Sequence, residues 1–162
     1  SLSLACCAQP ADLTYTVMPG ASEHFRAEVT KTMAAWAAEA GFEARETLSG
    51  RAMFQLASLD TPGLARIRTE RVWREGHFVR VLARVEVFIN RDQAPMPPEF
   101  AECVLLHEIG HVLGLHDTSD PDSIMCSDCP TCVIDEISRN TARDRIGAGW
   151  LDQRAEPWEV RP

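Results

Sequence analysis

Long apolar runs are absent from this sequence of 162 residues. No run approaches the roughly 18 residues that a membrane-spanning helix needs, so we expect no membrane-spanning segment. Basic residues are scarce as well, because 16 Lys and Arg stand against 24 Asp and Glu and give a net charge of −8. Phosphate binding needs a concentrated cationic surface. The only Arg-rich stretch, residues 66–91, is interleaved with acidic residues, so we expect no nucleic-acid partner.

Internal repeats and low-complexity segments are also absent, and the length suits one domain with one core. The charge is unevenly divided, because residues 92–162 carry 14 acidic and 5 basic groups whereas residues 1–91 carry 10 and 11. We expect a single domain over residues 12–162. Residues 1–11 leave three interpretations open: the remnant of an export signal, the lipobox of a lipid-anchored protein, and an expression scar or flexible terminus.

Cysteine is the residue type that indicates the compartment. Six cysteines in a chain of this length favour an oxidising environment and up to three disulfides, so we expect a secreted or extracytoplasmic protein. The disulfide candidates are Cys6, Cys7, Cys103, Cys126, Cys129 and Cys132. The last three could also hold a metal, but three thiols make an incomplete tetrahedral set, and disulfides are favoured. The pairing stays open, as does lipid anchoring through Cys6 or Cys7.

The spacing of apolar residues predicts the regular elements. Residues 22–41 have apolar side chains three to four apart, with Ser22 as N-cap and Gly41 as the stop, which predicts a helix. After it we expect several strands, then a bend at the Pro-rich stretch 92–98, and then two more helices, which together predict an α+β fold. The expected strands are 42–48, 52–59, 64–73 and 79–89, and the later helices are about 98–114 and 135–148.

The alternating pattern is clearest in the strand at 79–89. Apolar residues recur at every second position, so one face of the strand is expected to be buried. That face comprises Val79, Val81, Ala83, Val85, Val87 and Ile89.

Residues 107–117 read HEIGHVLGLHD and carry the chemistry of the sequence. In a helix, His107 and His111 lie one turn apart on one face, so their two imidazoles can bind one metal ion. Glu108 lies about 100° around the helix, where it can hydrogen-bond a water at that ion and act as a general base. Gly114 can end the helix in the left-handed conformation, so the chain can turn back and bring residue 117 to the metal.

This stretch resembles the zinc motif of the metzincin metalloproteases, HExxHxxGxx followed by His or Asp. Downstream, Ser123-Ile124-Met125 resembles the Met-turn of that family, in which a methionine packs beneath the zinc site, and we place this turn at about residues 123–126. The matrixin branch, especially its compact bacterial members, is the most similar. The similarity lies in the segment HEIGHVLGL, the later DPDSIM and the helix with Trp36. The resemblance spans about residues 12–150 and is sharpest over 103–125.

The resemblance implies a metzincin-like fold: a twisted mixed β-sheet with an N-terminal helix, an active-site helix, a Met-turn and a C-terminal helix. It also implies one catalytic Zn²⁺ bound by His107, His111 and Asp117, with His116 as the alternative third ligand. An Asp in the third position is similar to the snapalysin-like branch, and zinc accepts carboxylate oxygen. Histidines outside the motif are too few for a second, structural zinc site, and calcium binding stays open.

Substrate binding is likewise implied by the resemblance. In metzincins the substrate lies extended along an edge strand above the active-site helix, and we place that edge within about residues 79–94. The cysteine-containing segment after Met125 is expected to form a wall of the substrate pocket.

Chemistry and resemblance together predict a secreted zinc-dependent endopeptidase in which Glu108 takes a proton from an activated water. The partners are then protein or peptide substrates, and we expect a monomer. The alternative is a zinc-binding, non-proteolytic interaction domain on the same scaffold. Retention of Glu108 argues against it, because a structural zinc site needs no carboxylate beside an open coordination position.

Overall fold

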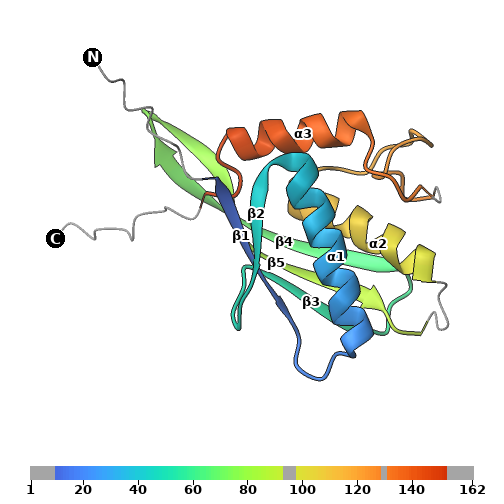
Figure 1. Cartoon of the computed structure of the whole chain (residues 1–162). Helices are drawn as coiled ribbons and strands as arrows, with labels where there is room; N and C mark the ends of the chain where they lie inside the picture. The colour runs from blue at the N-terminus through green and yellow to red at the C-terminus, as the bar shows by residue number, and fades with distance from the viewer. Residues whose placement is uncertain (1–9, 93–97, 129–130, 153–162) are drawn as a thin grey trace, which may run out of the picture.

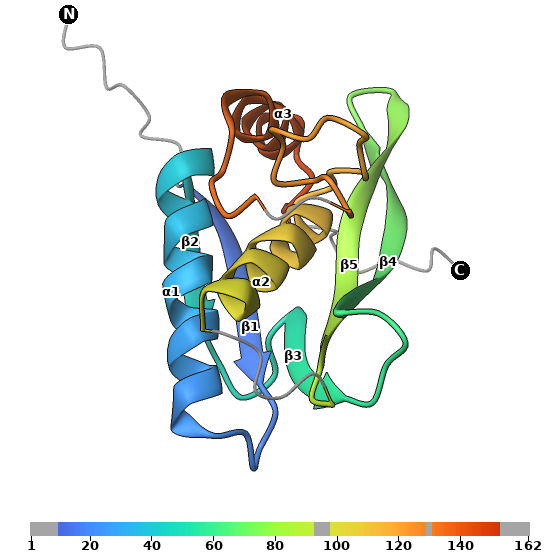
Figure 2. The same ribbon diagram turned by 90° about the vertical axis from the view of Figure 1, so that its right-hand side faces the viewer.

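The computed structural model describes residues 10–92, 98–128 and 131–152. Within them the chain forms a five-stranded mixed sheet and three helices, which confirms the predicted α+β, metzincin-like fold. Helices α1 and α2 pack on one face of the twisted sheet, and α3 lies across one end of them (Figures 1 and 2). The elements in order are β1 (Ala11–Val17), α1 (Glu23–Ala40), β2 (Phe42–Glu46), β3 (Ala52–Ala57), β4 (Gly63–Arg74), β5 (His77–Asn90), α2 (Pro98–Val112) and α3 (Glu136–Gly147).

The helix α1 follows the pattern expected from its sequence. The Ser22 hydroxyl accepts a hydrogen bond from the Phe25 N–H at 3.1 Å, and Gly41 ends the helix at a φ of 77°. Trp36 is fully buried, and its indole N–H donates to the Leu106 carbonyl of α2 at 2.8 Å. Since this bond joins the two helices deep in the core, α1 holds α2 in place against the sheet.

The strand order is β2-β1-β3-β5-β4. Neighbouring strands are parallel except β4, which pairs antiparallel with β5. The edge strand on the side of α2 is therefore β4, and the expectation that the edge lies within 79–94 was wrong. Residues 79–90 belong to β5, which is enclosed between β3 and β4. The chain forms the edge first, as β4, and then turns back as β5 between β4 and β3.

A β-bulge corrects the predicted face of β5. Arg68 pairs with Arg84, but the next residue of β4, Thr69, pairs with Leu82, so Ala83 is an extra residue in β5. The extra residue exchanges the two faces of the strand. Leu82 consequently shares the main core with Val85, Val87 and Ile89, while Val81 is buried outside that cluster.

Strand β1 was not predicted. It has Leu13, Tyr15 and Val17 buried at alternate positions, a period-two signal that is short and has Thr and Asp between. It lies inside the sheet between β2 and β3 and begins at Ala11, so this residue belongs to the sheet and not to a separate terminus. Residues 1–9 of the expected terminal segment lie outside the described residues, as do 93–97 of the Pro-rich bend.

Beyond the bulge, β4 and β5 continue as a hairpin that we call the arm, residues 69–82. Its turn has two successive positive φ values, 46° at Glu75 and 84° at Gly76, which suits the twist of a two-residue hairpin. The arm extends past the C-terminal end of α3 (Figure 1). The chain after α3 holds it, because Leu82 donates its N–H to the Trp150 carbonyl at 2.8 Å and Arg74 pairs with Asp152 at 2.6 Å.

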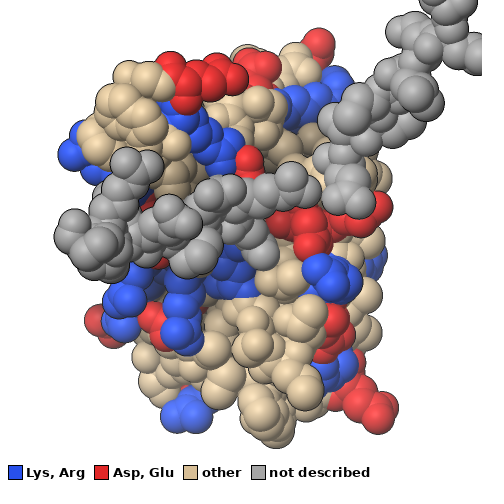
Figure 3. Space-filling model, turned by 90° about the vertical axis from the view of Figure 1, so that its left-hand side faces the viewer, with Lys and Arg blue, Asp and Glu red and all other residues tan. Residues whose placement is uncertain are grey.

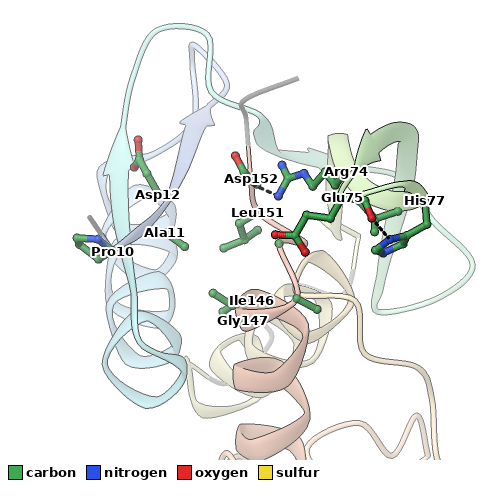
Figure 4. Close-up of a pocket in the computed structure, with 13 residues that line it drawn as sticks. Pro10, Ala11, Asp12, Arg74, Glu75, His77, Ile146, Gly147, Leu151 and Asp152 are labelled. Atoms are coloured by element: carbon green, nitrogen blue, oxygen red, sulfur yellow. Dashed lines mark hydrogen bonds and ion pairs between the residues drawn. The ribbon is translucent and has the colours of Figure 1, made fainter. Parts of the chain in front are cut away.

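Next to this contact lies a hollow of about 1240 Å³, between the start of β1, the arm and the end of α3. Figure 4 shows Arg74 reaching Asp152 across it, and His77 directed at the Glu75 carbonyl. None of the candidate metal ligands lines this hollow. Separately, no helix among the described residues is long and apolar enough to cross a membrane.

Candidate active site

The candidate metal ligands converge at one point. His107 and His111 project from one face of α2, with ring centroids 4.9 Å apart. Their Nε2 atoms lie 3.1 and 3.2 Å from Oδ1 of Asp117. Together these three residues form the one group of side chains within the described part of the chain that could hold a metal ion, with candidate ligand atoms within 4.8 Å of one another.

Backbone carbonyls determine which imidazole nitrogens face this point. Nδ1 of His107 lies 2.9 Å from the Ile124 carbonyl, and Nδ1 of His111 lies 2.9 Å from the Leu115 carbonyl. A carbonyl oxygen can only accept, so each Nδ1 carries the proton. In a neutral imidazole Nε2 is then the nitrogen with the lone pair, and on both residues this atom faces Asp117, as a metal ligand must.

Asp117 reaches the histidines because the chain reverses after α2. Gly114 has a φ of 85°, and the Leu115 N–H donates to the Gly110 carbonyl at 3.0 Å. A left-handed residue here closes the helix and directs the chain back along it. His116 is exposed and is not part of the group that the structure brings together.

The three ligands suit zinc. In a tetrahedral site with ligand bonds of about 2.0–2.1 Å, ligand atoms are separated by about 3.3 Å. The observed N–O separations of 3.1 and 3.2 Å are close to that value. Two neutral imidazoles and a carboxylate form a donor set that zinc accepts, and three protein ligands leave a coordination position for water or substrate.

Glu108 lies beside this group and is held differently from an ordinary surface glutamate. It is only 6% exposed, and its Oε2 atom is buried with no hydrogen-bond partner among the described residues. Burial raises the pKa of Glu108 to about 7, and the nearby Asp117 carboxylate contributes in the same direction. A carboxylate near this pKa can both accept and release a proton close to neutral pH.

Gly63, at the start of β4, was not singled out from the sequence. A Cβ atom there would lie 2.7 Å from Oε1 of Glu108 and 2.8 Å from Cγ1 of Val104. No real Cβ atom is found so close, so any larger residue at 63 displaces Glu108. The only signal in the sequence was the pair Pro62-Gly63, which indicates a turn and not a contact with a distant helix.

Gly110 is the second glycine that sequence reasoning missed. A Cβ there would lie 2.3 Å from Sδ of Met125, which is 2% exposed. The absence of a side chain at 110 therefore lets Met125 pack directly beneath α2, where the Met-turn was expected. The signal was the glycine between the two histidines of the motif, which we did not interpret.

Asp135 is a third missed residue and links the Met-turn to α3. As the N-cap of α3 it accepts from the Ser138 N–H at 2.8 Å, and its other oxygen accepts from the Ile124 N–H at 2.9 Å. Ile124 is the residue whose carbonyl accepts from His107, so Asp135 positions that carbonyl. Burial alone would raise the pKa of Asp135, but the hydrogen bonds from Ser138 and Ile124 outweigh it, and the pKa is lowered.

A hollow of about 520 Å³ opens over the ligand group. It is bounded by β4, α2 and the segment after Met125, the last of these as expected for a pocket wall. Cys103 of α2 forms a disulfide with Cys132, which fastens this segment to the helix. Cys126 is also disulfide-bonded. Of the other candidates, Cys6, Cys7 and Cys129 lie outside the described residues.

The fold and this site fit a class of protein, the metal-dependent hydrolases that carry their ligands on one helix and the turn after it. Comparison with protein families narrows the class, because residues 81–144 match the family model described as matrixin. This segment holds most of β5, α2, the three candidate ligands, Met125 and the greater part of α3. Over these residues the chain is similar to the matrixins, and the match supports a metallopeptidase in general. A comparison with curated proteins gives no match.

The contact between Gly63 and Glu108 gives the first prediction. Gly63→Ala should lower kcat by about ten- to a hundredfold, because a shift of about 1 Å in a catalytic group has effects of that size. Zinc content should be unchanged, since residue 63 touches no ligand. Gly147→Ala is the matched control, because a Cβ there meets nothing within 4 Å. Equal activity of the two variants would contradict the conclusion that Gly63 leaves room for Glu108.

The cap at Asp135 gives a prediction on stability and pH. Its pKa is depressed in the folded state, so its contribution is present above the unfolded pKa of about 3.9 and is lost as the pH falls further. Asp135→Asn keeps the shape but removes the charge and replaces one accepting oxygen with an NH2 group, and it should cost about 1 kcal/mol at pH 7. In urea denaturation, the difference from the parent protein should shrink below about pH 4. A difference that stays constant down to pH 3 would show that the charge plays no part.

Proposed function

We propose that the chain is a secreted zinc-dependent endopeptidase. The observation that carries the proposal is the convergence of His107 Nε2, His111 Nε2 and Asp117 Oδ1 beside the buried, unpaired Oε2 of Glu108. Such a site needs both a place for a metal and a proton acceptor within reach of it. The disulfide between Cys103 and Cys132 supports an oxidising, extracytoplasmic location.

In the proposed mechanism, His107, His111 and Asp117 would hold zinc, which would supply a Lewis acid to polarise the scissile carbonyl and to make a water molecule more acidic. Glu108 takes a proton from that water at Oε2 while the water oxygen attacks the carbonyl carbon. The same carboxyl then gives the proton to the amine nitrogen as the C–N bond breaks. A pKa of about 7 suits this exchange, since neither direction of proton transfer is strongly uphill at neutral pH.

The substrate in this proposal is a protein or peptide in extended conformation. As an edge strand, β4 has backbone groups that β5 does not use, and its residues Ala65 and Ile67 line the hollow over the ligand group. A peptide can add to such an edge by main-chain hydrogen bonds. The segment after Met125 lines the other side of the hollow, where it would contact substrate side chains.

The competing proposal is a zinc-binding interaction domain without activity. It accounts for the three ligands but not for Glu108, because keeping a carboxylate buried without a hydrogen-bond partner costs stability. A domain that only binds has no use for that group. The two proposals differ in whether substitution of Glu108 changes anything besides stability.

Substituting Glu108 and His107 separates metal binding from proton transfer. Glu108→Gln should retain zinc and lose about 10²–10⁴-fold in kcat for casein or a peptide library. His107→Ala should lose zinc as well. Glu102→Gln is a matched control on the same helix, where Glu102 forms only a surface ion pair with Lys31. Turnover that persists in Glu108→Gln, or that survives a zinc chelator in the parent protein, would refute the proposal.

The third ligand is tested by a pair of neighbouring substitutions. Asp117→Ala should weaken zinc binding by about tenfold or more, because it removes one of three protein ligands. His116→Ala should leave the affinity unchanged, because that side chain is exposed and outside the ligand group. Competition with a zinc chelator measures both. The opposite pattern would assign the ligand to His116.

A further inference from the structure

The arm carries an unusual combination of side chains on one face. Its exposed aromatic residues are Trp73, 63% exposed, and Phe78, 49% exposed. Their rings pack edge to face with centroids 4.7 Å apart. The guanidinium of Arg71 lies over the Phe78 ring at 4.6 Å. Arg80 stands directly opposite Arg71 in the hairpin register. Aromatic contact holds Arg71 in place while leaving its charge in solvent.

The register shows which way this face points. Leu82 faces the main core between sheet and helices, and side chains alternate along a strand. Phe78 and Arg80 therefore share the Leu82 side of β5, and their partners Trp73 and Arg71 share the same side of β4. Because the bulge exchanges the faces, this is also the side on which Ile67 lines the hollow over the ligand group.

The two arginines form a charge arrangement that the described residues do not balance. Like charges directly opposite in an antiparallel pair are unfavourable. Neither Arg71 nor Arg80 forms an ion pair within the part of the chain that the structure describes, whereas Arg74 at the end of β4 is paired with Asp152. Figure 3 views the molecule from the side toward which the arm points. Its basic side chains gather mostly on the left half, where β4 and β5 lie.

The position of Arg71 along β4 gives its distance from the candidate metal ligands. Ala65 lines the hollow over the ligands, and Arg71 lies six residues further along the same strand. At about 3.3 Å per residue the separation is about 20 Å. A substrate strand paired with β4 advances by the same rise, so its residues reach Arg71 about five to seven positions from the cleaved bond.

We infer that the arm is a substrate-binding surface that selects acidic side chains about five to seven residues from the cleaved peptide bond, through Arg71 and Arg80. The inference rests on the proposed function and names the substrate class of that site: extended protein segments with a carboxylate cluster at this distance. The net charge of −8 disfavours acidic proteins over most of the surface, so the arm supplies the attraction locally.

The experiment uses a series of fluorogenic peptides with one common cleaved sequence. A cluster of three Glu is placed about six residues before or after the cleaved bond, and the reference peptide has Gln at these positions. The parent protein should cleave one of the two Glu peptides with a kcat/KM about five- to tenfold above the Gln peptide at low salt, the sum of a few exposed ion pairs. At 0.5 M salt the preference should fall to about twofold or less.

The double variant Arg71→Gln/Arg80→Gln should lose this preference while cleaving the Gln peptide normally. Its matched control is Arg68→Gln/Arg84→Gln, a second cross-strand arginine pair that lies on the other face of the hairpin, and it should keep the preference. Equal cleavage of Glu and Gln peptides by the parent protein, or equal loss in both double variants, would overturn the inference and leave the proposed function standing. No chelator-sensitive cleavage of any peptide would instead refute the proposed function.

Discussion

Two backbone carbonyl oxygens determine that the histidines of α2 can act as metal ligands. The Ile124 and Leu115 carbonyls accept from Nδ1 of His107 and His111, so Nε2 of each ring is the atom directed at Asp117 and available to a metal. Neither carbonyl belongs to the helix that carries the histidines. The metal-binding geometry of α2 therefore depends on how the chain behaves after the helix ends.

The chain after α2 is shaped by contacts that also build the core. Gly114 reverses the chain, Met125 packs against the bare backbone at Gly110, and Asp135 ties Ile124 to the first turn of α3. The buried Trp36 fixes α2 to α1 through its bond to the Leu106 carbonyl. Site and core thus share residues, and a packing change at any of these positions reaches the ligands through one or two hydrogen bonds.

What the sequence could predict was local along the chain. The spacing of His107 and His111, the caps at Ser22 and Gly41, and the left-handed end of the helix at Gly114 depend on neighbours a few positions away, and each was identified. The place of β4 at the edge, the bulge at Ala83 and the contact of Gly63 with Glu108 depend on pairing between distant segments. A single sequence contains no direct signal for such pairings, and the short β1 was overlooked for lack of a longer alternating run.

The disulfide between Cys103 and Cys132 spans 29 positions, and that interval contains all three candidate ligands, Glu108 and Met125. A protease at high concentration can cleave other copies of itself. Exposed loops such as residues 116–122 are the preferred sites of such cleavage. One cut there would leave both fragments covalently joined through the bridge. A nicked molecule would migrate as an intact chain in electrophoresis until a reducing agent separated the two pieces.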